Sequence, residues 1–250
     1  MHTMSELVCA GLFNTRLKDN LKRGYKVNIP VFSEGSVTEV APGTEPTAVD
    51  LAGTALSVEV TNWFQIAAEI SDLMEIEEEA DYLAGAAKSC AYSMAKKIDT
   101  SIGVLFSALS SSSVYGADGQ TFTDDTFIAL VELLDEADIP DERFIIGDPS
   151  MRADMLGIDK FVRTDYIREP NVPTGKIGTL YNAKVYTTNN LTAATTGNYG
   201  VYAHRDAIAV VLQKAPRSRV YDMGYKFISK IIVDAAWAAQ ELRDTFGKSF

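Results

Sequence analysis

The most regular hydrophobic pattern in the chain covers residues 72–109 and predicts a long amphipathic helix. Ser71 or Asp72 can cap its start, and acidic residues crowd its first turns, where the helix dipole favours them. At 1.5 Å per residue, such a helix is on the order of 55 Å long, which exceeds the diameter of a typical small domain. Gly85 and Gly103 allow close packing or a bend. The apolar or small positions, spaced three or four apart, are Leu73, Ile76, Ala80, Leu83, Ala87, Ala91, Met94, Ile98, Ile102, Leu105 and Leu109.

Two β-forming segments before this helix predict a long hairpin. Residues 25–32 alternate between apolar and polar side chains, although Pro30 restricts them to an edge or irregular strand. About twenty residues rich in Pro, Gly, Thr and Glu follow. Residues 55–61 then alternate again, and Trp63 comes shortly afterwards. The tip has few apolar residues, so we expect the hairpin to be stable only where it lies on another surface.

The second half of the chain alternates between helix and strand patterns. Thr123 is a suitable N-cap for a helix over residues 124–137, and a short buried strand is expected over residues 143–147. Asp148 and Pro149 are typical of the N-cap and first position of a further helix.

Strand patterns continue toward the C-terminus, at residues 183–189, 201–204 and 208–212. Residues 221–237 alternate as in one long strand. Residues 231–242 fit a helix equally well, so the pattern leaves this last segment open.

The N-terminal region is expected to be a partly ordered basic arm. Residues 7–21 carry a weak amphipathic pattern that Gly11 and Asn14 interrupt. Residues 1–26 contain five basic and two acidic residues, which gives the arm a charge of +3.

Acidic residues are concentrated in the hairpin and the start of the long helix. The formal net charge is −11, and residues 27–87 contain twelve acidic residues and no Lys or Arg. The rest of the chain after residue 87 is nearly neutral, at −2. No cationic surface dominates, which argues against a protein that recognises nucleic-acid sequence. The acidic region is better suited to touching another molecule than to forming a pocket.

Candidate catalytic and metal-binding groups are scarce. His204, one of two histidines, has no partner at a fixed spacing and is expected to be structural, while Cys9 and Cys90 are expected to be free neutral thiols. No hydrolase elbow, dinucleotide fingerprint or zinc spacing occurs, and residues 175–179 depart from a phosphate loop because isoleucine follows Lys176. We therefore predict no catalytic, cofactor-binding or metal-binding residue and no cofactor. An α/β enzyme that uses Asp148 or the helix carboxylates is the less favoured alternative.

Membrane and export signals are also missing from the sequence. The chain has no run of eighteen apolar residues, and its N-terminus lacks the basic start and apolar run of a signal peptide. A soluble intracellular product is expected.

Five stretches, taken in order, carry a family resemblance. They are GYKVNIP at residues 24–30, AYSMAKKIDTSI at 91–102, IPDERFIIGDP at 139–149, GKIGTLYNAKVYTTNNL at 175–191 and AHRDAIA at 203–209. The fourth is similar to a family run of the form G-x-I-G-x-L-x-G-x-x-V-Y-x-T-N-x-L, with Asn182 where glycine is common. In their order and spacing, these stretches resemble the major capsid protein of tailed bacteriophages, which has the Hong Kong 97-like fold.

The resemblance implies an α+β fold with a spine helix, an extended β-hairpin loop, a peripheral domain and an axial domain. On this basis the chain divides into an N-terminal arm (1–23), the extended loop (24–70), a peripheral domain with the spine helix (71–121 and 214–250) and an axial domain (122–213). The implied function is self-assembly into an icosahedral shell that encloses double-stranded DNA, in a virion capsid assembled in the host cytoplasm. An encapsulin-type compartment and a gene-transfer particle shell have the same fold and stay open as alternatives.

The partners that the resemblance implies are further copies of the chain in hexamers and pentamers, portal and scaffolding proteins, and decoration proteins. Packaged double-stranded DNA would be touched without sequence specificity, and no membrane is involved. Expected subunit contacts are Glu34, Glu39, Glu45, Asp50 and Trp63 in the loop, and Lys22 and Arg23 in the arm.

The charge pattern leads to two expectations about how copies are joined. The basic arm could contact the acidic loop of an adjacent copy, so reversing Lys22 and Arg23 to Glu should impair assembly more than folding; these cations could equally face DNA. Some family members join a loop lysine covalently to a neighbouring asparagine. Because residues 27–87 contain no lysine, we expect no such cross-link. A ladder of multimers from boiled, denatured particles would contradict this.

Overall fold

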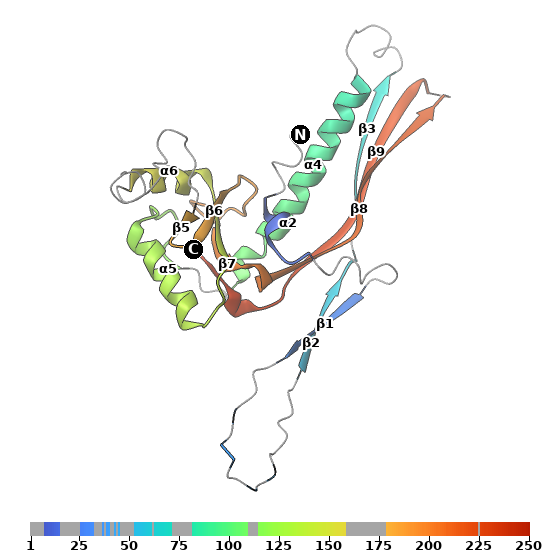
Figure 1. Ribbon diagram of the computed structural model, residues 1–250. Coiled ribbons are helices and arrows are strands. Elements are labelled where there is room, and N and C mark those ends of the chain that lie inside the picture. The colour runs from blue at the N-terminus through green and yellow to red at the C-terminus, as the bar shows by residue number, and fades with distance from the viewer. Residues whose placement is uncertain are drawn as a thin grey trace.

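Three groups of elements make up the structure, a computed structural model. It describes residues 8–15, 26–32, 37, 39–40, 43, 45, 53–61, 63–71, 82–109, 115–158, 179–224 and 226–250. A long helix lies along a three-stranded sheet, a five-stranded sheet with two helices stands beside them, and a two-stranded hairpin points away from both (Figure 1).

The three-stranded sheet has the order β3-β9-β8, and all its strands are antiparallel. Its strands are β3 (Trp63–Ser71), β8 (Ile208–Met223) and β9 (Ile228–Glu241), and the helix beside it is α4 (Tyr82–Gly103). Period-two alternation places one set of strand residues against the helix. The side chains that form this shared core include Ile70, Met94, Ile98, Ile102, Val210, Ile231, Val233, Ala235 and Trp237.

Helix α4 confirms the predicted apolar stripe over the residues that the structure describes. The predicted start at residues 72–81 lies outside them, and the predicted end at Leu109 is wrong. The helix ends at Gly103, and a 3₁₀ turn follows at η2 (Phe106–Ala108). Gly103 lies against another segment, because a Cβ there would sit 3.0 Å from the carbonyl oxygen of Asn190. The tighter turn still brings Leu109 into the core, where it is fully buried.

The five-stranded sheet has the order β10-β7-β4-β6-β5 and is mixed, since β4 pairs parallel with β6 and antiparallel with β7. Its core joins α5, α6 and the strands through Phe127, Leu130, Ile145, Met155 and Tyr202. The elements are α5 (Asp124–Glu136), β4 (Arg143–Gly147), α6 (Pro149–Gly157), β5 (Thr179–Leu180), β6 (Ala183–Thr187), β7 (Val201–His204) and β10 (Gly247–Ser249).

Both predicted helix caps in this part of the chain are confirmed. The hydroxyl of Thr123 accepts a hydrogen bond from the amide of Thr126 at 3.3 Å. The carboxylate of Asp148 accepts from the amide of Met151 at 2.8 Å, and Pro149 occupies the start of α6. Each side chain satisfies an amide that the helix itself leaves unpaired.

The predicted hairpin forms, but it is shorter than expected. Strands β1 (Lys26–Phe32) and β2 (Gly53–Glu59) pair antiparallel, with Lys26 opposite Glu59 at the base. The segment from Trp63, which the sequence places in the same loop, instead forms β3 and pairs with β9. Alternate residues of β3 pack in the core beside α4, an apolar surface that the hairpin does not offer.

The open assignment at residues 231–242 is settled in favour of a strand. Both faces of β9 are largely buried, so its apolar residues form an almost continuous run that mimics a helical pattern. The single strand predicted over residues 221–237 is wrong at its start. The chain turns between β8 and β9, where the amide of Lys226 donates to the carbonyl of Met223 at 2.7 Å and Phe227 has φ +53°.

Strand β8 is much longer than the predicted residues 208–212, because it continues to Met223. Its pairing with β9 shifts register between Leu212 and Lys214 and again between Lys214 and Arg217. Pro216 lies within the second shift, and a proline has no amide to donate to the ladder. The bulged region therefore interrupts the period-two pattern that would have marked the strand.

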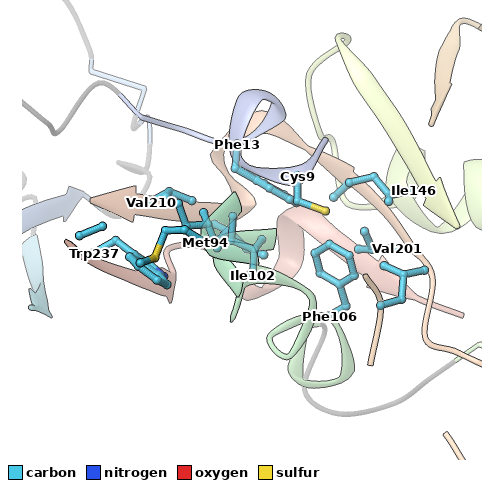
Figure 2. Close-up of a cluster of buried hydrophobic side chains, with 14 of the residues drawn as sticks. Cys9, Phe13, Met94, Ile102, Phe106, Ile146, Val201, Val210 and Trp237 are labelled. Carbon is cyan, nitrogen blue, oxygen red and sulfur yellow. The ribbon is translucent and has the colours of Figure 1, made fainter. Parts of the chain in front are cut away.

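The predicted partly ordered arm is wrong for residues 8–14, which belong to the core. Helix α2 (Cys9–Leu12) lies beside the lower end of α4 (Figure 1). Cys9 and Phe13 have no exposed surface and lie among the apolar side chains of the core (Figure 2). The ring centroid of Phe13 lies 5.1 Å from that of Phe144, which connects the segment to the five-stranded sheet. Both cysteines are buried free thiols, as expected.

Two polar contacts hold this N-terminal segment in place. The fully buried carboxylate of Asp99, in α4, accepts hydrogen bonds from the amides of Val8 at 2.8 Å and Ala10 at 3.3 Å. Asn14 forms a bridge with Ala209 of β8, and its side-chain amide donates to Asp206 at 2.9 Å. The segment thus touches α4 and both sheets.

A pair of carboxyl groups lies where β9 leads into the five-stranded sheet. Glu241 ends β9, and Asp244 begins the turn η4 (Asp244–Phe246) just before β10. Burial raises the pKa of Glu241 to about 7, and a hydrogen bond to the carboxyl of Asp244 and its negative charge add to the rise. The two groups therefore share a proton most readily below neutral pH.

We expect Glu241→Gln to change how stability depends on pH. The raised pKa means that the stabilising contribution of Glu241 is present below its ordinary value of 4.5 and is lost as the pH rises through about 7. Glutamine keeps a hydrogen-bond donor toward Asp244 without a charge, so the variant should gain Tm relative to the wild type between pH 4.5 and pH 8. Thermal unfolding across this range measures the difference. A Tm difference that does not vary with pH would contradict the assignment.

Candidate assembly surfaces

No catalytic constellation appears among the residues that the structure describes. Within them, no group of three His, Cys, Asp or Glu side chains is placed to hold a metal ion. His204 has a structural contact, since its Nδ1 accepts a hydrogen bond from the amide of Asp206 at 3.2 Å and its ring packs edge-on against Phe246. None of the described helices combines the length and apolar character needed to span a bilayer.

A cavity of about 500 Å³ lies between the start of α6 and the loops at residues 115–122 and 194–199. Its three carboxylates are occupied by backbone amides. Asp118 accepts from Thr196 at 2.8 Å and from Gly197 at 3.0 Å, Asp154 accepts from Phe122 at 3.0 Å, and Asp148 caps α6. The carboxylates therefore fix loops in place.

The base of the hairpin is anchored on the three-stranded sheet. Val58 and Val60 are buried, together with Val27, against a small apolar cluster on the face of the sheet opposite α4. An ion pair of 3.2 Å between Lys26 and Glu59 closes the same end. The paired strands then run away from the rest of the molecule (Figure 1).

Beyond its paired strands, the hairpin exposes acidic and apolar side chains. Glu39, Glu45 and Val37 are all exposed, and Val37 is completely so. The other predicted contact residues Glu34, Asp50, Lys22 and Arg23 lie outside the described residues. Trp63 is described, but it stands on β3 rather than on the hairpin.

Trp63 belongs to the face of the three-stranded sheet that is turned away from α4, which we call the outer face. Strand register places four rows of side chains across it. These rows are Trp63–Ala236–Lys214, Gln65–Asp234–Arg217, Ala67–Ile232–Arg219 and Glu69–Lys230–Tyr221. The apolar cluster at the hairpin base adjoins the first row through Ala236.

Asp234 organises the first two rows. Its carboxylate accepts from the indole Nε1 of Trp63 at 3.1 Å and from Arg217 at 2.8 Å, and it pairs with Lys214 at 2.6 Å. The hydrogen bonds from Arg217 and Lys214 hold the pKa of Asp234 well below its usual range. The ammonium of Lys214 also lies 3.8 Å from the centroid of the Trp63 ring, which nevertheless stays 64% exposed.

Trp63 was among the contact residues predicted from the sequence, but the cations beside it were not. Lys214, Arg217 and Arg219 fall within six residues, and period-two spacing from residue 217 would have placed Arg217, Arg219 and Tyr221 on one face. The signal was hidden because β8 was predicted to end at Leu212. Without the strand, these residues have no common side.

The fold is that of the subunits in tailed-bacteriophage capsid structures. The structure of Mycobacterium phage Che8 is similar with a TM-score of 0.78 at 20% identity, over 96% of this chain and 89% of that chain. The capsid structure of cyanophage P-SCSP1u gives a TM-score of 0.72 at 13% identity, over 91% and 83%. The capsid of Myoviridae phage XM1 gives 0.69 at 12% identity, over 98% and 91%. No family model and no curated protein matches the sequence.

Proposed function

We propose that this chain is a structural major capsid protein that assembles into an icosahedral shell enclosing double-stranded DNA. The observation that carries the proposal is the shared fold, which extends over 96% of the chain at a TM-score of 0.78. A likeness of this extent leaves no part of the chain for a separate catalytic domain. We accordingly propose that the protein is not an enzyme.

The shape of the molecule supports a role in assembly. An isolated two-stranded hairpin is marginally stable in water, and this one leaves Val37 and two carboxylates exposed beyond its strands. A second surface, around the exposed Trp63, lies on the body of the same chain. Two different surfaces on one subunit can pair between neighbours around a ring and close it, which is the arrangement that hexamers and pentamers need.

We further propose that the finer architecture of the chain is that of the Hong Kong 97-like fold. Helix α4 would be the spine helix, β1 and β2 the extended loop, and the five-stranded sheet with α5 and α6 the axial domain. Strand pairing favours shifting the expected boundaries, because β3 pairs with the peripheral strand β9 and β10 pairs with β7. The residues expected at 24–70 would then divide between the loop and the peripheral domain.

The proposed partners follow from assembly in a virion. Copies of this chain would form the shell, with a portal and scaffolding proteins during assembly in the host cytoplasm, and decoration proteins as an addition on the outside. DNA would be touched without sequence specificity and no membrane would be involved. A compartment of the encapsulin type, or a gene-transfer particle, uses the same kind of shell for different contents.

Purification of the expressed chain tests the proposal. We expect fast-sedimenting material that appears as closed shells of uniform size by negative-stain electron microscopy. The proposed function would be wrong if the purified chain stayed monomeric or formed only small oligomers at protein concentrations that allow shells to assemble. Nuclease-resistant DNA in particles from infected or induced cells would favour the virion, whereas enclosed protein cargo would favour a compartment.

A further inference from the structure

We propose that the exposed face of helix α4, which we call the lysine face, binds the phosphate backbone of the DNA that the shell encloses. Its exposed residues are Lys88, Ser89, Tyr92, Ser93, Lys96 and Lys97. The inference rests on the proposed function, since it names the surface that meets the contents of the shell. It differs from the expectation that cations of the N-terminal arm, such as Lys22 and Arg23, face DNA.

Every exposed charge on α4 is positive. Between Tyr82 and Gly103 the helix contains three lysines and a single acidic residue, Asp99. Asp99 is fully buried, and its carboxylate accepts hydrogen bonds from the amides of Val8 and Ala10. Its oxygens are thus occupied by the N-terminal segment and do not pair with a lysine. The lysine face can therefore attract a polyanion although the whole chain has a net charge of −11.

The three lysines of α4 also keep their charges unpaired within the part of the chain that the structure describes. Lysines of the hairpin and of the three-stranded sheet are bound to carboxylates, at 3.2 Å for Lys26, 2.6 Å for Lys214 and 2.9 Å for Lys230. Lys88 and Lys97 have no acidic residue three or four positions away on the helix, which is the spacing that allows a pair. Their ammonium groups are available to an external phosphate.

The composition of the lysine face favours a nucleic acid over a protein partner. Lysine and serine are depleted at the centres of protein–protein interfaces, where aromatic residues and methionine are enriched. The large side chain of this face, Tyr92, is only 38% exposed. Ser89 and Ser93 are small enough to let a duplex approach the helix, and serine hydroxyls donate hydrogen bonds to phosphate oxygens. Lysine is a compact charge on a flexible stem, which suits contacts without sequence specificity.

The spacing of the lysines fits one duplex. At 1.5 Å per residue, Lys88 and Lys96 are about 12 Å apart along the helix axis. That length of duplex carries about seven phosphate charges. Lys97 adjoins Lys96, so all three side chains can reach the same stretch of DNA backbone.

The position of α4 in the fold places the lysine face on one side of the subunit. Helix α4 lies along β3 and β9 (Figure 1). The buried hairpin base at Val58 and Val60 and the exposed Trp63 lie on the opposite face of the same sheet. Contacts between copies through those groups leave the lysine face uncovered on the other side of the shell wall, which the proposal places toward the interior.

Lysine acetylation of DNA-filled particles tests the contact directly. An acetylating reagent would be applied to filled particles and to the same particles after release of their DNA, with modified lysines identified by mass spectrometry. We expect Lys88, Lys96 and Lys97 to react at least about threefold more slowly in filled particles, because phosphates hold and shield their amines. Lys184, an exposed lysine on β6, is the internal control and should react equally in both.

A charge-removing variant supplies an independent readout. We expect particles built from Lys88→Gln with Lys96→Gln and Lys97→Gln to release their DNA at a lower temperature than the wild type, because the wall no longer offsets phosphate repulsion. The difference should shrink as salt rises, since salt screens exposed charges. The matched control removes three exposed cations elsewhere, with Arg152→Gln, Lys184→Gln and Lys226→Gln, and should release DNA at the wild-type temperature.

The outcomes separate this inference from the proposed function. Equal acetylation of the three α4 lysines in filled and emptied particles overturns the inference and leaves the proposed function standing, and so does an unchanged or salt-independent release temperature in the variant. A variant that keeps its wild-type Tm but forms no shells also overturns it, because the lysine face would then bind protein. Wild-type particles that never contain DNA overturn both proposals.

Discussion

Phe13→Ala is expected to lower the free energy of unfolding by about 3–5 kcal/mol, the usual cost of deleting a large buried aromatic ring. Phe13 has no exposed surface, and its ring lies 5.9 Å from that of Phe106 and 5.1 Å from that of Phe144. The cavity would open between α4 and the five-stranded sheet, where neither side can move freely to fill it. Urea unfolding of the unassembled chain measures the change.

Phe227→Ala is the matched control for this substitution. Phe227 is 73% exposed in the turn between β8 and β9, so the same change there should alter stability by no more than about 0.5 kcal/mol. Equal midpoints for Phe13→Ala and the wild type would mean that the N-terminal segment does not hold the position described here.

Asp99→Ala is expected to lower the free energy of unfolding by about 3 kcal/mol, because it leaves buried backbone amides at the start of α2 without a hydrogen-bond acceptor. The carboxylate has no exposed surface, and burial raises its pKa while the amides of Val8, Ala10 and Cys9 oppose the rise. Removing it leaves those amides without an acceptor in an apolar setting. The expected result is a lower midpoint in urea and faster hydrogen exchange at residues 8–14.

Asp148→Ala supplies the comparison for Asp99→Ala. Asp148 caps α6 by accepting from Met151, but it is only partly buried, and water can replace it. Its loss should cost about 1 kcal/mol, as for an ordinary N-cap. If Asp99→Ala were no more costly than Asp148→Ala, the burial of the Asp99 contact would have no energetic consequence.

The sequence predicted elements well where local signals were complete. Thr123, Asp148 and Pro149 mark their helices by chemistry that acts within one turn, so no distant contact was needed to place them. Hairpin pairing was also predictable, because residues 25–32 and 55–61 alternate and are separated by turn-forming residues. In each case the signal lies within the element itself or in the segment that joins its strands.

Prediction failed where tertiary contacts outweigh local pattern. Phe13 follows Gly11 and belongs to no regular hydrophobic pattern, so only its contacts with Phe106 and Phe144 explain its burial. The outer face could not be predicted for the same reason. Strand pairing brings Trp63, Lys214 and Asp234 together, although 171 positions separate Trp63 from Asp234 in the sequence. The register that joins them is not encoded at any one of the three positions.

The placement of residues 8–14 has a consequence for synthesis of the chain. Asn14 bridges Ala209, so its final partner is made about 195 residues later. Until β8 has emerged from the ribosome, Cys9 and Phe13 have no complete core to enter. We therefore expect residues 8–14 to be among the last parts of the chain to reach their native positions, and such long-range closure slows folding. A chaperone that shields exposed apolar segments would act on this protein while most of it is still being made.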